Sequence, residues 1–277
     1  MADALRVACI QMTSGPNIAD NLETAEQHIR EAVADGARFV VTPENTCRIR
    51  FPAPKNMDDA LTQDNHPGVP FFSHLAKELG IMLLIGSLVV LGDENKLLNR
   101  SFLFDPDGTL RTTYDKIHLF DVELPTGETH RESDTMHRGG RAVIAKVNDD
   151  FNAGLSICYD LRFAYLFREL AQNGANIMCT PAAFTVPTGR AHWEVLQRAR
   201  AIETGSYVMA AAQVGVHDGG RRTYGHSMIV DPWGKVLSVK EEGQGYICAD
   251  LNIAEVEKAR SVIPALKHDR EFILDKG

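Results

Sequence analysis

Short apolar runs in the first half of the chain predict buried strands. The runs at 5–12, 37–42 and 81–88 have the length and the composition of strands that are covered on both faces. Residues that alternate in polarity on each side of the turn sequence "DPDG" predict a hairpin over 99–114. The first half therefore supplies three buried strands followed by a hairpin.

Apolar residues at helical spacing fill the gaps between these strands. Asn21 is expected to cap the first helix, whose apolar face would consist of Leu22, Ala25, Ile29, Ala32 and Val33. Pro70 is expected to begin the second helix, which would bury Phe71, Phe72, Leu75 and Leu79. The predicted order of the first half is strand, helix, strand, helix, strand and hairpin.

The second half repeats this order. Its predicted elements are a strand at 153–158, a helix through 163–170, a strand at 176–180, a helix at 189–204, a strand at 207–214 and a hairpin at 224–240. Local sequences repeat as well, because "DGARFVVTP" at 35–43 and "NGANIMCTP" at 173–181 agree at Gly, Ala, Thr and Pro. Common turn chemistry explains a single echo, but two echoes in the same element order favour an internal duplication.

Two such halves predict an α/β fold of four layers. Each half forms a largely apolar sheet that needs cover on both faces. Packing sheet on sheet with helices outside gives an α-β-β-α sandwich with internal pseudo-twofold symmetry. No Pro-, Gly- or Ser-rich linker separates the halves, so residues 1–277 are expected to form a single domain.

Composition narrows the function classes. The 277 residues carry a net charge of −8 without a marked Lys/Arg run, which argues against nucleic acid or a membrane as partner. Five cysteines without a visible secretory signal favour a reducing, cytoplasmic location over a disulfide framework. Metal-ligand spacings, P-loops and dinucleotide fingerprints are missing, so no cofactor and no metal are expected.

Three short motifs carry the candidate chemistry. Glu44 in "TPEN", Lys116 in "YDKIHLFD" and Cys158 in "SICYDLRF" each follow a predicted buried strand. Taken singly, Glu44 reads as a salt-bridge partner, Lys116 as a surface lysine and Cys158 as an inert buried thiol. Together they supply a base, a cation for an oxyanion and a nucleophile. The backbone N–H of Tyr159, at the start of the next helix, is a second oxyanion donor.

These motifs resemble those of the nitrilase superfamily of carbon–nitrogen hydrolases, and the similarity covers almost the whole chain. The resemblance implies the four-layer sandwich and a Glu–Lys–Cys triad of Glu44, Lys116 and Cys158. It also implies that Glu132, in "HRESDT", orients the lysine and assists proton transfer. It further implies a homodimer or a higher homo-oligomer formed through the helical layer beside the site.

The segments 188–204 and 224–234 look most like one branch of that family. The branch implies an amidase that hydrolyses the amide of a small acidic compound, such as deaminated glutathione, to an acid and ammonia through a thioester. An omega-amidase acting on 2-oxo acid monoamides is the runner-up. A nitrile or N-carbamoyl hydrolase with the same triad stays open, because thiolate attack begins each reaction.

Further residues have both functional and structural interpretations. Arg162, a turn beyond Cys158, can bind a substrate carboxylate or form a structural ion pair with Asp160 or Glu169. Phe184 and Thr188 line the acyl pocket by resemblance, or pack a loop. His226 would support a Cys/His hydrolase, but no Asn or Asp pattern accompanies it. A non-catalytic scaffold is the alternative from another class, and it gives no reason to keep the whole triad.

Overall fold

The computed structural model describes residues 4–50, 59–92, 96–123, 127 and 129–277. The first of its two six-stranded sheets has the order β16 (Gly245–Leu251), β1 (Leu5–Gln11), β2 (Phe39–Val41), β3 (Met82–Leu91), β4 (Leu97–Phe104) and β5 (Leu110–Asp115). The second has the order β15 (Val236–Lys240), β14 (Ser227–Val230), β11 (Tyr207–Ala210), β10 (Ile177–Cys179), β9 (Asn152–Leu155) and β8 (Ile144–Lys146). In both sheets the three central strands are parallel and the outer ones antiparallel.

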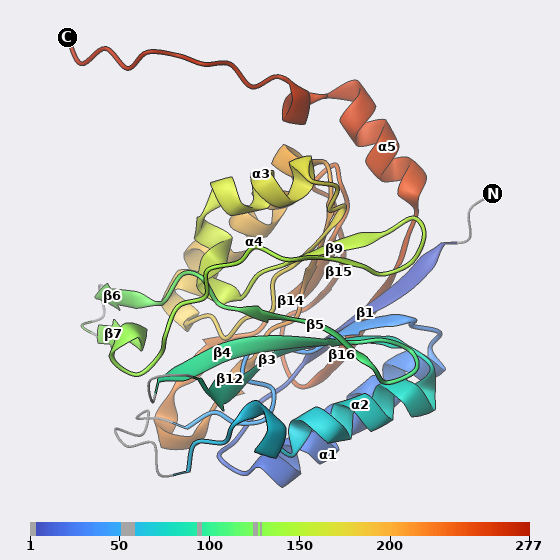
Figure 1. The fold of residues 1–277 in the computed structure, drawn as a ribbon, viewed down its shortest axis with the longest axis vertical. Helices are drawn as coiled ribbons and strands as arrows, with labels where there is room; N and C mark the ends of the chain where they lie inside the picture. The colour runs from blue at the N-terminus through green and yellow to red at the C-terminus, as the bar shows by residue number, and fades with distance from the viewer. Residues whose placement is uncertain (1–3, 51–58, 93–95, 124–126, 128) are drawn as a thin grey trace.

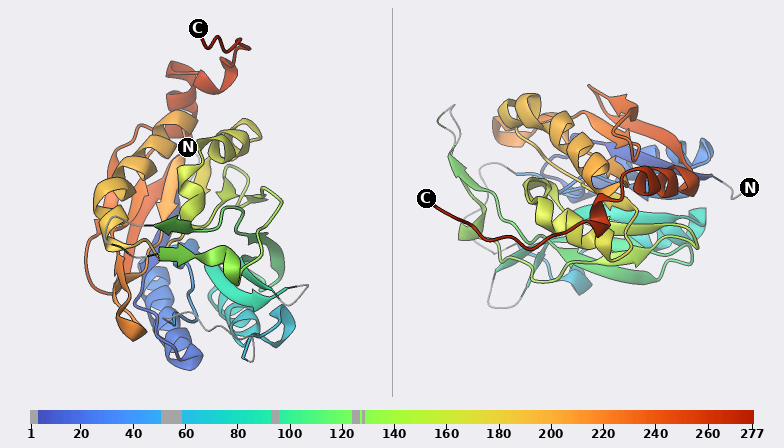
Figure 2. Two further views of the ribbon diagram at one scale, coloured as in Figure 1. Left: turned by 90° about the vertical axis from the view of Figure 1, so that its left-hand side faces the viewer. Right: turned by 90° about the horizontal axis from the view of Figure 1, so that it is seen from above.

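Helices cover the outer faces of the two sheets (Figures 1 and 2). Helices α1 (Ile18–Ala34) and α2 (Gly68–Leu79) contact the first sheet, and α3 (Ala164–Gln172) and α4 (Val186–Thr204) contact the second. A last helix, α5 (Ile253–Val262), follows β16. The predicted four-layer α-β-β-α sandwich is confirmed, as are both predicted hairpins, β4–β5 and β14–β15.

Strand β1 shows why the apolar runs are continuous. Val7 and Cys9 pack in the core that lies between the sheets, whereas Ala8 and Ile10 pack in the core beneath α1 and α2. All four residues are fully buried. Because successive side chains point to opposite faces of a strand, burial of both faces requires an apolar residue at every position.

Two helix starts differ from the prediction. The side chain of Asn17, not Asn21, accepts a hydrogen bond at the start of α1, from the N–H of Ala19. Asn21 lies inside the helix, where its buried amide bonds the backbone of Gly15 and the carbonyl of Cys47. Of the expected apolar face, Leu22, Ala25, Ile29 and Ala32 are buried and Val33 is half-buried. Helix α2 starts at Gly68, two residues before the predicted Pro70.

Strand β16 links the two halves in a way that the repeat does not predict. It comes from the second half of the chain and pairs antiparallel with β1 at the edge of the first sheet. It also contacts β14 and β15 of the second sheet. Strand β16 therefore connects the two sheets, in addition to the core that they share.

The described residues show neither a membrane-spanning helix nor a metal-binding cluster. None of the helices in these ranges is both long and apolar enough to span a bilayer. No group of three or more His, Cys, Asp or Glu side chains in the same ranges is arranged to hold a metal ion.

Small elements complete the chain near the site. Two short hairpins lie outside the large sheets: β6 (Asp121–Glu123) with β7 (Thr129–Arg131), and β12 (Val214–Val216) with β13 (Arg222–Tyr224). A 3₁₀ turn, Cys158–Arg162, connects β9 to α3. These segments surround the cavity described next.

Candidate active site

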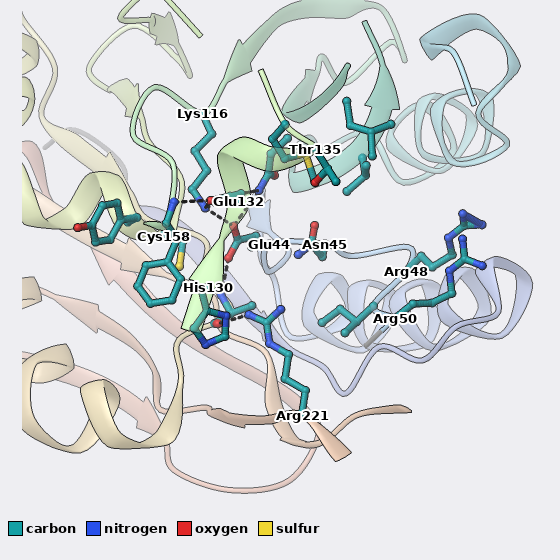
Figure 3. A pocket seen from close by; sticks show the side chains of 18 of the residues that line it. Glu44, Asn45, Arg48, Arg50, Lys116, His130, Glu132, Thr135, Cys158 and Arg221 are labelled. Carbon is teal, nitrogen blue, oxygen red and sulfur yellow. Dashed lines mark hydrogen bonds and ion pairs between the residues drawn. The ribbon is translucent and has the colours of Figure 1, made fainter. Parts of the chain in front are cut away.

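The structure brings the three motif residues together at one end of the sheets (Figure 3). Glu44 follows β2, Lys116 follows β5, and Cys158 lies between β9 and α3. The Nζ atom of Lys116 lies 3.0 Å from Oε1 of Glu44. The thiol of Cys158 lies beside the same carboxylate, which raises the pKa of the thiol. A thiol, a carboxylate and an ammonium therefore lie together, as the motifs predict.

The sequence predicts that Cys158 ends a strand, but in the structure the strand ends before it. Strand β9 ends at Leu155, and Cys158 opens the 3₁₀ turn, with α3 beginning only at Ala164. The φ of Cys158 is +49°, in the left-handed region that non-glycine residues seldom occupy. Its N–H donates to the carbonyl of Pro181 at 2.9 Å, which holds this conformation. The next residue, Tyr159, lines the cavity beside it.

Glu132 and Asn99 complete the polar network. Glu132 accepts hydrogen bonds from Nζ of Lys116 at 2.9 and 3.1 Å and from the N–H of Phe120 at 2.7 Å. The Nδ2 atom of Asn99 donates to Glu44 at 2.9 Å and to Glu132 at 3.3 Å. Asn99 thus bridges the two carboxylates that hold the lysine. None of the sequence motifs points to Asn99. In the structure the carbonyl of Asn99 accepts the N–H of Lys116 across the β4–β5 hairpin.

The charges of the triad follow from burial and contact. Burial raises the pKa of Glu44, but the ammonium of Lys116 and the hydrogen bonds outweigh it, and the pKa ends below its usual value. Burial lowers the pKa of Lys116, yet Glu132 and Glu44 raise it well above its usual value. Burial and Glu44 raise the pKa of the Cys158 thiol more than Lys116 lowers it. The resting state therefore pairs a carboxylate and an ammonium with a neutral thiol.

These groups lie at the floor of a cavity of about 620 Å³. That volume is in the range of small-molecule sites. Phe184 and Thr188, both expected near the acyl pocket, are among its lining residues, and Cys47 lines it as well. Phe184 packs on Trp193 with ring centroids 4.9 Å apart, so one wall of the cavity is a rigid aromatic surface.

The structure places Arg162 outside the cavity lining. Its guanidinium lies behind the wall, 5.8 Å from the ring centroid of Tyr159 and 5.6 Å from that of Phe184. Nη2 of Arg162 is 3.3 Å from Nδ1 of His192. The expected contact of Arg162 with a substrate carboxylate stays a prediction. Arg162 is the last residue of the 3₁₀ turn that Cys158 begins.

His226 is likewise remote from the proposed chemistry. Its ring stacks on Tyr224 with centroids 3.9 Å apart, and its Nδ1 lies 2.9 Å from the carbonyl of Tyr224. It does not line the cavity. This geometry gives no support to a Cys/His hydrolase.

Asp160 connects the segment that contains Lys116 to the turn that contains Cys158. Its side chain, which is fully buried, accepts hydrogen bonds from the hydroxyl of Tyr114 at 2.7 Å and from the N–H of His118 at 3.0 Å. It also accepts the N–H of Ile157 at 2.8 Å. One carboxylate thereby fixes the residues on both sides of Lys116 to the residue before Cys158.

We expect Asp160→Asn to lower the free energy of unfolding by about 2–4 kcal/mol, because an amide leaves some of these donors unpaired. The value of kcat should fall about tenfold, since Lys116 and Cys158 lose their shared support. Urea denaturation and steady-state kinetics measure both effects. Asp149→Asn, at a surface aspartate that pairs only with Lys146 among the described residues, is the matched control. Unchanged stability in Asp160→Asn would contradict this structural role.

Comparisons with known proteins agree with this geometry. A sequence profile described as carbon-nitrogen hydrolase matches residues 6–261. A Synechocystis protein named deaminated glutathione amidase is 40% identical over 272 residues, which is 96% of this chain and 98% of the relative. The mouse protein of the same name is 39% identical over 270 residues, covering 95% of this chain and 83% of its own length.

Solved structures show the same fold. The C. elegans NitFhit protein superposes with a TM-score of 0.89 at 35% identity, over 97% of this chain and 65% of that longer chain. Saccharomyces cerevisiae Nit3, described as a member of branch 10 of the nitrilase superfamily, gives a TM-score of 0.84 at 30% identity, covering 97% of both chains.

Proposed function

This chain belongs to the carbon–nitrogen hydrolase family and is a hydrolase of carbon–nitrogen bonds other than peptide bonds, and we propose that it cleaves the amide of a small acidic compound with Cys158 as nucleophile. One observation carries the proposal. The carboxylate of Glu44 contacts both the ammonium of Lys116 and the thiol of Cys158 at the floor of the cavity.

The geometry supports a reaction in two stages. Sγ of Cys158 attacks the amide carbon, and its proton moves to Glu44. Lys116 and the N–H of Tyr159 stabilise the oxyanion. The carbon–nitrogen bond breaks as Glu44 returns the proton to the leaving nitrogen, and a thioester remains. Water, deprotonated by Glu44, then attacks the thioester, and the acid and the free thiol are released.

The relatives named deaminated glutathione amidase support an acidic substrate of that kind. The amide nitrogen of deaminated glutathione carries a cysteinylglycine unit, so its hydrolysis releases that dipeptide rather than ammonia. A cavity of about 620 Å³ has room for such a substituent. An omega-amide of a dicarboxylic acid would instead release ammonia, as the sequence analysis expected.

A panel of three substrates tests the proposal. Deaminated glutathione, 2-oxoglutaramate and a neutral amide of similar length would be incubated with the protein, and the released amine and acid would be quantified. We expect turnover of at least one acidic amide, and an acyl adduct on Cys158 in mass spectra of acid-quenched reactions. No product from any of them, with no adduct, would refute the amidase assignment and favour a binding scaffold.

The pKa directions predict the dependence of activity on pH. Because the pKa of Glu44 lies below 4.5 and those of Cys158 and Lys116 lie above their usual values, the active protonation state should persist through neutrality. We expect kcat/KM to be constant from about pH 5 to about pH 8. The depressed pKa of Glu44 also stabilises the fold above pH 4.5, and this contribution is lost as pH falls through the folded-state pKa.

A pH series of kcat/KM with 2-oxoglutaramate, together with urea midpoints, checks this prediction. A steep acid limb near pH 6 would show that the base is a different group from Glu44.

A further inference from the structure

Arg221 is an unusual arginine among those that line the cavity. Arg48 and Arg50 pair with Asp59, and Arg131 pairs with Glu123 at 2.8 Å. Arg221 forms no ion pair with a carboxylate among the described residues. Its guanidinium lines the cavity, where it helps to lower the pKa of Glu44 without forming an ion pair with it.

The hydrogen bonds of Arg221 are also incomplete. Nη2 donates one long bond, 3.3 Å, to the carbonyl of Ala183. The Nε atom is buried and has no hydrogen-bond partner within the described ranges. A guanidinium offers several N–H donors in a planar fork that matches a carboxylate. Leaving a buried donor unpaired is costly, so these donors are suited to a ligand that supplies an anion.

The backbone fixes Arg221 beside the reacting groups. Tyr224, three residues later, donates its N–H to the carbonyl of Phe184 at 2.9 Å. The N–H of Ala183 donates to Oε2 of Glu44 at 2.8 Å. Figure 3 shows the side chain of Arg221 reaching toward Glu44 from the side of the site opposite to Lys116. An anion held by Arg221 would thus lie close to the scissile bond, away from the oxyanion donors.

We infer that Arg221 binds a carboxylate on the acyl part of the substrate and sets the preference of the enzyme for acidic amides. The inference rests on the proposed function and adds its specificity determinant. It gives Arg221 the part that the sequence assigned to Arg162, which lies behind the cavity wall. A compound with an anionic group a few bonds from the scissile carbonyl, such as a dicarboxylic acid monoamide, fits this arrangement.

The test compares two substrates with the same carbon chain and different charge. One is 2-oxoglutaramate, and the other is its methyl ester, in which the acyl carboxylate is neutral; ammonia release gives kcat and KM for each. The variants are Arg221→Met, Arg221→Lys and Arg162→Met. Arg222→Met is the matched control, because Arg222 is the neighbouring arginine, is exposed and does not line the cavity.

We expect the unmodified protein to prefer the charged amide by about 10- to 100-fold in kcat/KM, the range of a hydrogen bond to a charged group. Arg221→Met should abolish the preference mainly by raising KM for the charged amide, with a smaller effect on hydrolysis of the ester. Arg221→Lys should restore part of the preference, since an ammonium lacks the fork. Arg222→Met and Arg162→Met should keep it.

Persistence of the preference in Arg221→Met would overturn the inference, and its loss in Arg162→Met would return the role to Arg162. Calorimetric titration with glutarate, a dicarboxylate that needs no turnover, separates this outcome from failure of the proposed function. If neither amide is hydrolysed but glutarate binding still weakens at least about tenfold in Arg221→Met, the amidase proposal fails and the anion site stands. Equal glutarate affinity in both proteins refutes the site.

Discussion

Replacement of Cys158 by alanine should lower kcat/KM by at least about 10⁴-fold while the protein stays folded. Among the cysteines, Cys158 is the one whose thiol lies beside Glu44 and lines the cavity. Without the sulfur, no thioester can form, and Glu44 can only assist direct attack by water. That route lacks the positioned nucleophile and should be slow.

The stability of Cys158→Ala should change by less than about 1 kcal/mol. The side chain borders the cavity, so its loss enlarges existing space instead of opening a new void in the core. Alanine also accepts the φ of +49° at the same steric cost as cysteine, so the strain of the turn is unchanged. Thermal unfolding and circular dichroism would verify that the variant is folded.

Cys179→Ala provides the control for this prediction. Cys179 is a fully buried thiol in β10, and it does not line the cavity. Its removal should leave kcat/KM within a few-fold of the unmodified value. More than trace amidase activity in Cys158→Ala would refute the assignment of the nucleophile, whatever the control shows.

The layers of the fold could be predicted because burial leaves a direct mark on the sequence. A strand covered on both faces needs apolar residues at consecutive positions, as in β1, and that run is visible without a structure. The order of strands, helices and hairpins then repeats, which indicates two sheets. Strand β16 escaped this reasoning, because its exposure is mixed and its partner, β1, lies more than 200 residues away in the chain.

The meeting of Glu44, Lys116 and Cys158 at one cavity could also be predicted, since each follows a predicted buried strand and the three residue types complete one chemistry. The directions of the arginine side chains could not be predicted. Of the two arginines Arg162 and Arg221, only Arg221 lines the cavity. The difference arises from a 3₁₀ turn in one case and from a short hairpin tied to Phe184 in the other. Neither feature has a periodic signature that the sequence displays.

Asn17 and Asn21 illustrate the same limit at smaller scale. Both are asparagines near the start of α1, and either can cap a helix. The choice depends on the loop at Gly15 and on the carbonyl of Cys47, which together occupy the amide of Asn21. Asn99 is similar, because its role as a bridge between Glu44 and Glu132 exists only after three strands have been brought together.

Lys116→Met should lower kcat by at least about 10²-fold and should also destabilise the fold. The ammonium is buried between Glu44 and Glu132, at 3.0 and 2.9 Å. Methionine preserves much of the side-chain length but leaves two neighbouring carboxylates without their cation. Breaking a buried ion pair on one side typically costs about 3–5 kcal/mol. The catalytic loss has two causes. The oxyanion loses a charged donor, and Glu44 is more often protonated and then cannot act as a base.

The pH dependence of stability distinguishes this cause from simple loss of packing. In the unmodified protein Lys116 outweighs the effect of burial on the pKa of Glu44. Without it, burial should raise the pKa of Glu44, so the neutral acid becomes the favoured form in the folded state. The variant should then be least stable above that raised pKa and should recover stability as pH falls toward 5. Urea denaturation at about pH 8 and about pH 5 measures the difference.

Lys146→Met separates this effect from the removal of any lysine. Lys146 is an exposed residue of β8 that pairs with Asp149 at 2.7 Å, and such surface pairs contribute little. Its loss should change neither kcat nor the pH dependence of stability. If Lys116→Met instead kept a normal kcat and only raised KM, Lys116 would be a substrate-binding residue. The oxyanion would then have to be stabilised by backbone donors such as the N–H of Tyr159, because the buried ammonium would have no effect on the transition state.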